Sequence, residues 1–238
     1  MSNLIIDEGN TLCKAAVVSN GVILAQTSGH DIVDAALQDF AAQYGINNII
    51  SASTRRERVE LPAALQGIKH VRLCADTKLP IQIKYSTPNT LGLDRVAAAV
   101  GASVLFPQSD VLIIDLGTAI TIDFLTHKGE FLGGVISPGP AMRAKALNTF
   151  TGRLPLVDIP TDASLCGQST TEALQFGILN GIRYEVDGYI NAYRAENKDI
   201  KVVVTGGAAS VIVRSDVVRD PNLVIIGMNR ILELNSAE

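Results

Sequence analysis

A segment near the start of the chain recurs 108 residues later, and this repeat is the feature that most restricts the fold. Residues 4–11 (Leu-Ile-Ile-Asp-Glu-Gly-Asn-Thr) align with residues 112–119 (Leu-Ile-Ile-Asp-Leu-Gly-Thr-Ala), and at the same shift Gly21 aligns with Gly129. Each copy predicts three strands joined by an Asp-x-Gly turn and a second glycine turn. Because the match keeps its register for about twenty residues, we expect two related lobes.

The segments that follow each three-strand unit alternate between helical and extended patterns. Helices are expected at residues 31–44, 56–65, 96–106, 170–194 and 228–234, with another from the Gly206-Gly207 turn to about Val213. Strands are expected at residues 48–53, 71–74, 201–204 and 221–226. The boundary falls at residues 107–111, which predicts an α/β chain with lobes at residues 1–108 and 109–238.

Charge and cysteine content exclude several classes of protein. The net charge of −4 favours neither nucleic acid nor an anionic membrane as a partner, and the Arg55, Arg56 and Arg58 cluster is interpreted as a solvated helix face. The three cysteines are far apart, which argues against disulfides and zinc and for a reducing compartment. With no leader pattern and no membrane-length apolar helix, we expect a cytoplasmic protein. The three histidines lie apart from the motifs, so no histidine chemistry is assigned.

The Asp-x-Gly turns suggest phosphate binding. Asp7, Gly9 and Thr11 supply a carboxylate, an accessible backbone and a hydroxyl, and Lys14 follows within reach of a phosphate oxygen. A single turn of this kind is better explained as a plain hairpin turn. Two copies, each opening a lobe, favour a polyphosphate held between them, and the Thr205-Gly206-Gly207 turn is a further candidate contact.

Two other polar segments precede expected helices. Asp94 and Arg95 lie at a helix start, where the acid could take a hydroxyl proton and the guanidinium could pair with a carboxylate. The alternative is that Asp94 only stabilises the helix N-terminus. Ser169 and Thr170 are interpreted first as N-cap candidates and second as a substrate contact.

Taken together, these motifs resemble the type III pantothenate kinases, in that family's order and over essentially the whole chain. The matching blocks are residues 7–14 (Asp-x-Gly-Asn-Thr-x-x-Lys), 85–95 (Tyr, Pro and Gly-x-Asp-Arg), 115–121 (Asp-x-Gly-Thr-Ala-x-Thr), 132–139, 167–173 and 205–207. The family belongs to the acetate-and-sugar-kinase, Hsp70 and actin superfamily. The resemblance therefore implies a duplicated ribonuclease H-like (actin-like ATPase) fold, in which each lobe has a mixed sheet flanked by helices.

The resemblance also implies roles for individual residues and partners. The catalytic proton acceptor would be Asp94, and Asp115 would hold a monovalent cation, potassium or ammonium. The implied pantothenate contacts are Tyr85, Gly92, Leu93, Asp94, Arg95 and Thr170. The implied ATP contacts are Asp7, Glu8, Gly9, Asn10, Thr11, Leu12, Cys13, Lys14 and Thr118. Magnesium would bridge the phosphates, and the family works as homodimers.

Some residues depart from the family pattern. Glu8, Thr87, Ile120 and the Gln168-Ser169 pair replace the usual residues, while Asp7, Asp94, Arg95, Asp115 and Thr118 are retained. We therefore expect a kinase that phosphorylates pantothenate, the first step toward coenzyme A. Two alternatives are a non-catalytic regulator of the same fold and another small-molecule kinase or phosphatase of the superfamily.

Overall fold

The computed structural model describes residues 1–31, 34–55 and 59–236. The chain divides into two compact units, Met1–Pro107 with Asn222–Glu238, and Gln108–Pro221. The end of the chain thus groups with the first unit by its contacts. The lobes at residues 1–108 and 109–238 describe the duplication in the sequence, and they stay a prediction.

The first unit is built on a five-stranded sheet. Its strands are β1 (Ser2–Glu8), β2 (Cys13–Ser19), β3 (Val22–Gly29), β4 (Ile46–Ser53) and β5 (Lys69–Arg72), in the order β3-β2-β1-β4-β5. The pairs β1–β2 and β2–β3 are antiparallel, whereas β1–β4 and β4–β5 are parallel. Asn20 and Gly21 close the second hairpin with φ of 50° and 75°, the left-handed values that such a two-residue turn requires.

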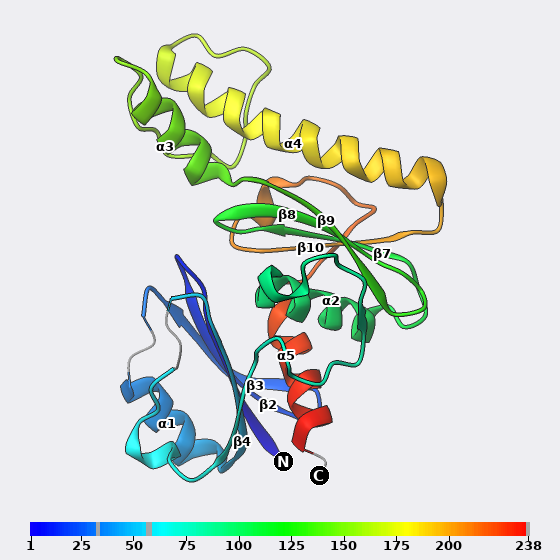
Figure 1. Ribbon diagram of the computed structural model, residues 1–238. Coiled ribbons are helices and arrows are strands. Elements are labelled where there is room, and N and C mark those ends of the chain that lie inside the picture. Colours follow the sequence, from blue (N-terminus) through cyan, green and yellow to red (C-terminus); the bar gives the residue numbers. More distant parts are fainter. Residues whose placement is uncertain (32–33, 56–58, 237–238) are drawn as a thin grey trace. The chain divides into compact units, whose positions relative to one another are not determined.

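Helices cover both faces of this sheet. Helix α1 (Asp34–Tyr44) buries Leu37 against a core that includes Leu4 and Ile49. Helix α5 (Leu223–Ser236) packs on β1 and β4, and α2 (Leu93–Leu105) packs on α5. Figure 1 shows α1 and α5 on opposite sides of the sheet. The start of α2 is therefore fixed to the sheet through α5.

Glycines let α2 and α5 approach each other closely. A Cβ added to Gly227 would lie 1.8 Å from the Ala97 carbonyl oxygen, and one added to Gly101 would lie 2.1 Å from the Leu223 carbonyl oxygen. No side chain fits at such distances, so both glycines are needed for this contact. The contact sets where the polar start of α2 lies in the first unit.

The second unit repeats the topology of the first. Its strands β7 (Val111–Leu116), β8 (Ala119–Leu125), β9 (Glu130–Pro138), β10 (Lys201–Thr205) and β11 (Val218–Arg219) follow the order β9-β8-β7-β10-β11. The first two pairs are antiparallel and the last two are parallel, as in the first unit. The expected duplicated ribonuclease H-like fold is confirmed. A short strand, β6 (Gln82–Ile83), belongs to the part of the chain before α2.

Two helices complete the second unit. They are α3 (Pro140–Phe150) and α4 (Thr170–Glu196), which contact each other. One face of α4 buries Ile178, Ile182 and Val186 against Leu112 and Ile114 of β7. A spacing of four residues places these side chains on one stripe of α4, the helix that the sequence predicts at residues 170–194.

Several predicted elements are confirmed with shifted ends, and three are wrong. Residues 32–33 and 56–58 lie outside the described residues, but residues 59–62 are not helical, and only Ala63–Leu65 forms a short 3-10 turn. Pro62 lacks an N–H donor, which disfavours a continuous helix. The helix expected after Gly207 is reduced to the 3-10 turn Ala209–Val211.

The third error lies near the chain end. Residues 221–226 were expected as a strand, but α5 begins at Leu223. Its apolar run reads as a strand because the helix is buried on most sides, including Leu223, Ile225 and Met228. Helix α3 was not expected, although Pro140 at its first turn is a helix-start signal.

An ion-pair network ties the far end of α4 to the segment before β11. Arg214 donates to Asp187 and Asp216, and Arg194 also pairs with Asp216. Hydrogen bonds from Arg214 and then Arg194 hold the pKa of Asp216 well below its usual range. A lowered folded-state pKa adds stability above the unfolded value, and this contribution is lost as pH falls through the folded value.

We therefore expect Asp216→Asn to reduce the free energy of unfolding by about 1 kcal/mol at pH 7, because the half-exposed network is screened by solvent. The difference from wild type should begin to shrink as pH falls below about 4, where Asp216 of the unfolded chain takes up a proton. It should keep shrinking as pH falls further toward the lower pKa of the folded state. Denaturant titrations from pH 7 to pH 2 measure this. Asp162→Asn, at a 92% exposed partner of Arg183, is the control and should change nothing. An undiminished difference at pH 2 would contradict the electrostatic origin.

Candidate active site

The first Asp-x-Gly turn joins β1 to β2 at the carboxyl end of β1. The Gly9 amide donates to the Leu12 carbonyl at 3.1 Å, and a Cβ on Gly9 would lie 2.9 Å from that oxygen. The Thr54 amide and hydroxyl both donate to the Glu8 carbonyl, at 2.9 and 3.1 Å. The turn is thus closed internally and fastened to the end of β4.

The side chains in this segment are not equally accessible. Glu8 is 5% exposed and Cys13 is 1% exposed, whereas Leu12 is 41% exposed. Burial raises the pKa of the Cys13 thiol, which donates to the His30 carbonyl. Of the predicted ATP contacts, Glu8 and Cys13 therefore present little side-chain surface to a nucleotide.

Arg55 and His30 brace the same turn, which the sequence analysis missed. Arg55 donates to the Asn10 carbonyl at 2.9 Å and to the His30 carbonyl at 2.6 Å, and it pairs with Asp31. The His30 ring nitrogen Nδ1 lies 3.1 Å from the Thr11 carbonyl oxygen.

The interpretation of Arg55 as part of a solvated helix face is wrong, as is the placing of His30 away from the motifs. Arg56 and Arg58 of that cluster lie outside the described residues. The Asp-x-Gly turn itself gave no sequence signal for these distant contacts.

The second turn, between β7 and β8, is enclosed by glycine backbone. The Gly117 amide donates to the Ala119 carbonyl at 3.1 Å, and the Gly139 amide donates to the Thr118 carbonyl at 3.1 Å. A Cβ on Gly139 would lie 2.3 Å from the Thr118 oxygen and 2.5 Å from the Gly117 oxygen. The end of β9 therefore packs directly on the backbone of this turn, while Thr118 stays exposed.

A third glycine turn meets the same place. Gly206 has a φ of +91°, and a Cβ there would lie 2.4 Å from an Asp115 carboxylate oxygen. The Ala208 amide donates to the Leu116 carbonyl at 3.0 Å. The structure thus brings together the predicted Asp115, Thr118 and the Thr205-Gly206-Gly207 turn within one unit.

The surroundings of Asp115 suit a weakly held cation. The half-buried carboxylate stands at the end of β7, next to the Gly117 and Gly206 backbone. Among the described residues, no group of three or more His, Cys, Asp or Glu side chains is placed to hold a metal ion. A single carboxylate favours a hard ion that keeps part of its water shell over a transition metal.

The start of α2 carries the predicted acceptor residues. Asp94 is exposed in the first helical turn, and its Oδ1 accepts from the Arg95 amide at 2.8 Å. A Cβ on Gly92 would lie 2.5 Å from that Oδ1, so glycine leaves room for the carboxylate. Arg95 is 6% exposed, with its guanidinium carbon 5.6 Å from the centroid of the Tyr85 ring. The structure thus joins Tyr85, Gly92, Asp94 and Arg95 into one cluster.

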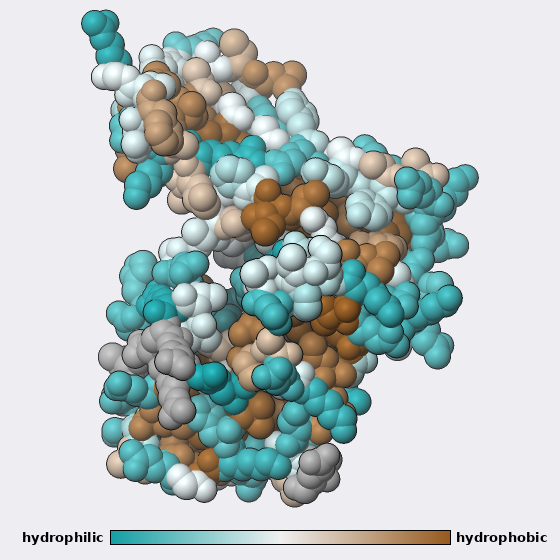
Figure 2. All heavy atoms as spheres, viewed as in Figure 1, coloured by the Kyte–Doolittle hydropathy of each residue, from teal (hydrophilic) through white to brown (hydrophobic). Residues whose placement is uncertain are grey.

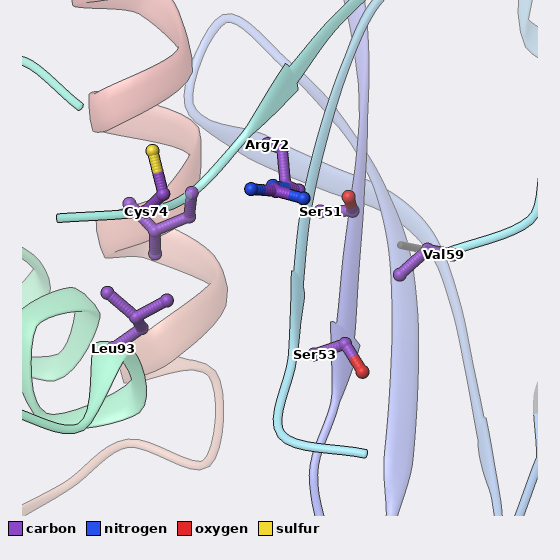
Figure 3. A pocket seen from close by; sticks show the side chains of 7 residues that line it. Ser51, Ser53, Val59, Arg72, Cys74 and Leu93 are labelled. Atoms are coloured by element: carbon purple, nitrogen blue, oxygen red, sulfur yellow. The ribbon is translucent and has the colours of Figure 1, made fainter. Parts of the chain in front are cut away.

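Leu93 lines a cavity of about 220 Å³ in the first unit. The other lining residues are Ser51, Ser53, Val59, Arg72, Leu73 and Cys74, from the carboxyl ends of β4 and β5 and the segments after them. Figure 3 shows the Arg72 guanidinium between Ser51 and Cys74. A hydrogen bond with the Thr77 hydroxyl is the first cause of a lowered pKa of Cys74. Sequence reasoning did not find this cavity, because its residues come from separate elements.

The polar turn before α4 is a helix cap, as the first interpretation of this segment predicts. Ser169 is the N-cap, and its hydroxyl accepts from the Glu172 amide at 3.2 Å. Glu172 in turn accepts from the Gln168 amide at 2.7 Å. Thr170 is the exposed first residue of the helix.

Comparison with solved structures agrees with this architecture. A Baf family protein from Campylobacter jejuni superposes with a TM-score of 0.61 at 23% identity, with 99% of this chain and all of the other covered. The repeated sheet order and the glycine-lined Asp turn of each unit define a chain of the duplicated ribonuclease H-like (actin-like) fold class.

Sequence relatives define the group within this class. The type III pantothenate kinase model matches residues 3–192. A type III pantothenate kinase from Cytophaga hutchinsonii is 41% identical, with 98% of this chain and 99% of its own length covered. Another from Porphyromonas gingivalis is 39% identical, with 98% of both chains covered. The chain belongs to the type III pantothenate kinase family.

Proposed function

We propose that the chain transfers the γ-phosphate of ATP to the primary hydroxyl of pantothenate, the first step toward coenzyme A. The observation that carries this proposal is the cluster at the start of α2, where Gly92 leaves space for an exposed Asp94 beside the Arg95–Tyr85 pair. Family membership supplies the substrate class.

Each unit contributes a turn to nucleotide binding. In the first unit, residues 7–14 bind ATP, chiefly through Asp7, the Gly9 to Leu12 backbone and Lys14. In the second unit, the exposed Thr118 hydroxyl binds a phosphate oxygen. Support comes from the backbone geometry of both turns, which excludes a Cβ at Gly9 and at Gly139.

Two kinds of ion complete the proposed site. Asp115 holds a monovalent cation, potassium or ammonium, and the ATP phosphates carry Mg²⁺. Such ions offset the charge that develops on the phosphoryl oxygens during transfer. Support for a cation at Asp115 is its half-buried carboxylate among glycine backbone atoms.

The acceptor is oriented by the first unit. Tyr85, Gly92, Leu93 and Arg95 contact pantothenate, and the family resemblance also assigns Thr170 as a pantothenate contact. Asp94 takes the proton of the pantothenate hydroxyl, and the hydroxyl oxygen attacks the γ-phosphorus of ATP. The bond from that phosphorus to the β–γ bridging oxygen breaks, which releases ADP. Phosphoryl transfer needs mainly positioning and charge neutralisation, so an ordinary carboxylate suffices as the base.

ADP release measured with pantothenate as acceptor tests the proposal. We expect release to need pantothenate and to be faster in potassium than in sodium. Absence of turnover in either salt would favour a non-catalytic regulator. Equal turnover with other hydroxylated acids would favour a different small-molecule kinase of the superfamily.

We further propose a cytoplasmic homodimer that binds neither nucleic acid nor membrane. Among the described residues, no helix has the length and apolarity needed to cross a bilayer. Large apolar side chains are exposed along α3, namely Met142, Leu147 and Phe150, and Leu165 in the following segment is 88% exposed. Figure 2 shows hydrophobic residues, in brown, at the surface of the part of the molecule where Figure 1 labels α3. Exposed apolar groups of this kind favour burial against a second copy.

We expect Phe150→Glu to weaken the dimer by about 30-fold or more, because Phe150 is 86% exposed and a central apolar anchor contributes strongly to an interface. Light scattering across a concentration series measures the change. Val213→Glu, at a 75% exposed apolar position in the same unit, is the control and should leave the dimer intact. A Phe150→Glu protein as dimeric as wild type would exclude α3 from the interface.

A further inference from the structure

Three polar side chains, those of Ser137, Arg143 and Glu185, hold the segment that packs on the turn between β7 and β8. We call these three side chains the clamp. Arg143 of α3 donates from Nε to the Pro138 carbonyl at 2.8 Å and pairs through its terminal nitrogen with Glu185 of α4. The Ser137 hydroxyl donates to the other Glu185 oxygen at 2.5 Å. The end of β9 is therefore held from two helices.

The clamped segment leads directly to the turn. Gly139 follows Pro138, is buried, and donates its amide to the Thr118 carbonyl at 3.1 Å. A Cβ at Gly139 would lie 2.3 Å from that oxygen, so the two backbones pack without space between them. A shift of one backbone therefore displaces the other. Any displacement of Pro138 is thus passed to Thr118 through one hydrogen bond and one tight contact.

The charged side chains of the clamp are largely shielded from solvent, which helps to keep their geometry fixed. The Arg143 and Glu185 side chains are 22% and 21% exposed. A partly buried pair with both carboxylate oxygens engaged is geometrically specific, because each partner also has a second, fixed hydrogen bond. Arg143 and Glu185 lie outside the blocks that resemble the family, whereas Ser137 lies within the block of residues 132–139.

We infer that Arg143, Glu185 and Ser137 are positioning residues for nucleotide binding: they fix the Pro138-Gly139 backbone and, through it, the phosphate-binding Thr118 turn. The inference rests on the proposed role of Thr118. Arg143 acts through the backbone and does not itself contact the nucleotide.

Steady-state kinetics of the full chain test the inference. Arg143→Met should raise the KM for ATP about tenfold, the loss expected for one charge-assisted hydrogen bond, with less than about a twofold change in the KM for pantothenate. Glu185→Gln should shift the KM for ATP in the same direction. Arg143→Lys keeps a charge that can pair with Glu185 but lacks the separate, rigidly placed Nε donor that bonds the Pro138 carbonyl, so it should retain more of the wild-type Tm without restoring the KM.

A second arginine provides a matched control. Arg194 of α4 also pairs with a carboxylate and also donates to a backbone carbonyl, both at Asp216, and its side chain is 25% exposed. Arg194→Met should lower the Tm and leave the KM for ATP unchanged. If Arg143→Met lowered the Tm in the same way with no change in the KM for ATP, the clamp would be structural only and the inference overturned.

ADP binding to a Thr118→Ala variant, measured by calorimetry, separates this inference from the proposed function. Weaker binding in Thr118→Ala and in Arg143→Met supports both. Weaker binding in Thr118→Ala alone overturns the clamp while leaving the phosphate turn in place. Unchanged binding in Thr118→Ala overturns the role of that turn and the inference with it.

Discussion

Asp94→Asn should lower kcat by about 10²–10⁴-fold, the range that general-base help contributes. The amide is nearly isosteric and keeps an oxygen that can accept from the Arg95 amide, as the carboxylate does at 2.8 Å. The start of α2 should therefore keep its shape while losing the group that accepts the hydroxyl proton. ADP affinity should not change, because nucleotide contacts are assigned to other turns.

The control for this variant is Asp34→Asn. Asp34 is likewise an acidic residue in the first turn of a helix of the first unit, α1, with no proposed role in catalysis. Both substitutions remove the favourable interaction of an acid with a helix N-terminus, worth about 0.3–1 kcal/mol. Single-turnover and steady-state rates distinguish the two, and a kcat near wild type in Asp94→Asn would end the assignment of the base.

Gly206→Ala should reduce the free energy of unfolding by about 2–4 kcal/mol, since an alanine is strained at positive φ and the added atom overpacks the site. The φ of Gly206 is +91°, and its Cβ would lie 2.4 Å from an Asp115 oxygen and 2.5 Å from the Leu116 carbonyl carbon. The Asp115 carboxylate must then shift. We expect weaker ADP binding and a higher potassium concentration for half-maximal activity.

Gly129→Ala is the control that separates backbone strain at positive φ from steric crowding by the added Cβ. Gly129 also has positive φ, +74°, but nothing lies within 4 Å of its Cβ position. Its substitution should cost about 1–2 kcal/mol and leave ligand binding unchanged. Chemical denaturation and calorimetry measure both variants. Equal losses of stability, with normal ADP binding in both, would show that Gly206 does not shape the site.

Local sequence was enough to predict the paired meanders and the residues at their turns. The Asp-x-Gly turns need only a strand end and a glycine next to it, and β1 and β7 end where the repeat places them. The Ser169 cap is local in the same way, since its partner Glu172 is three residues away. Interactions between residues that are close in the sequence can be recognised from the local residue pattern.

Contacts from distant segments were not predictable in this way. Arg55 reaches Asn10 over 45 positions, and Arg143 reaches Glu185 over 42. The long side chain of an arginine can lie on a solvated surface or contact a distant segment, and the local sequence does not distinguish the two. The cavity beside Leu93 was missed for the same reason, because its walls come from β4, β5 and α2.

The sequence by itself determined the duplication, the strand-and-turn units and the identity of the polar residues at their ends, because repeat register and turn chemistry are local properties. Only the tertiary structure decided that residues 223–236 form a helix packed on the first unit and that Gly139 and Gly206 enclose the Asp115 turn. An apolar run is compatible with strand or helix, and a glycine with many turns, until the packing partners select one.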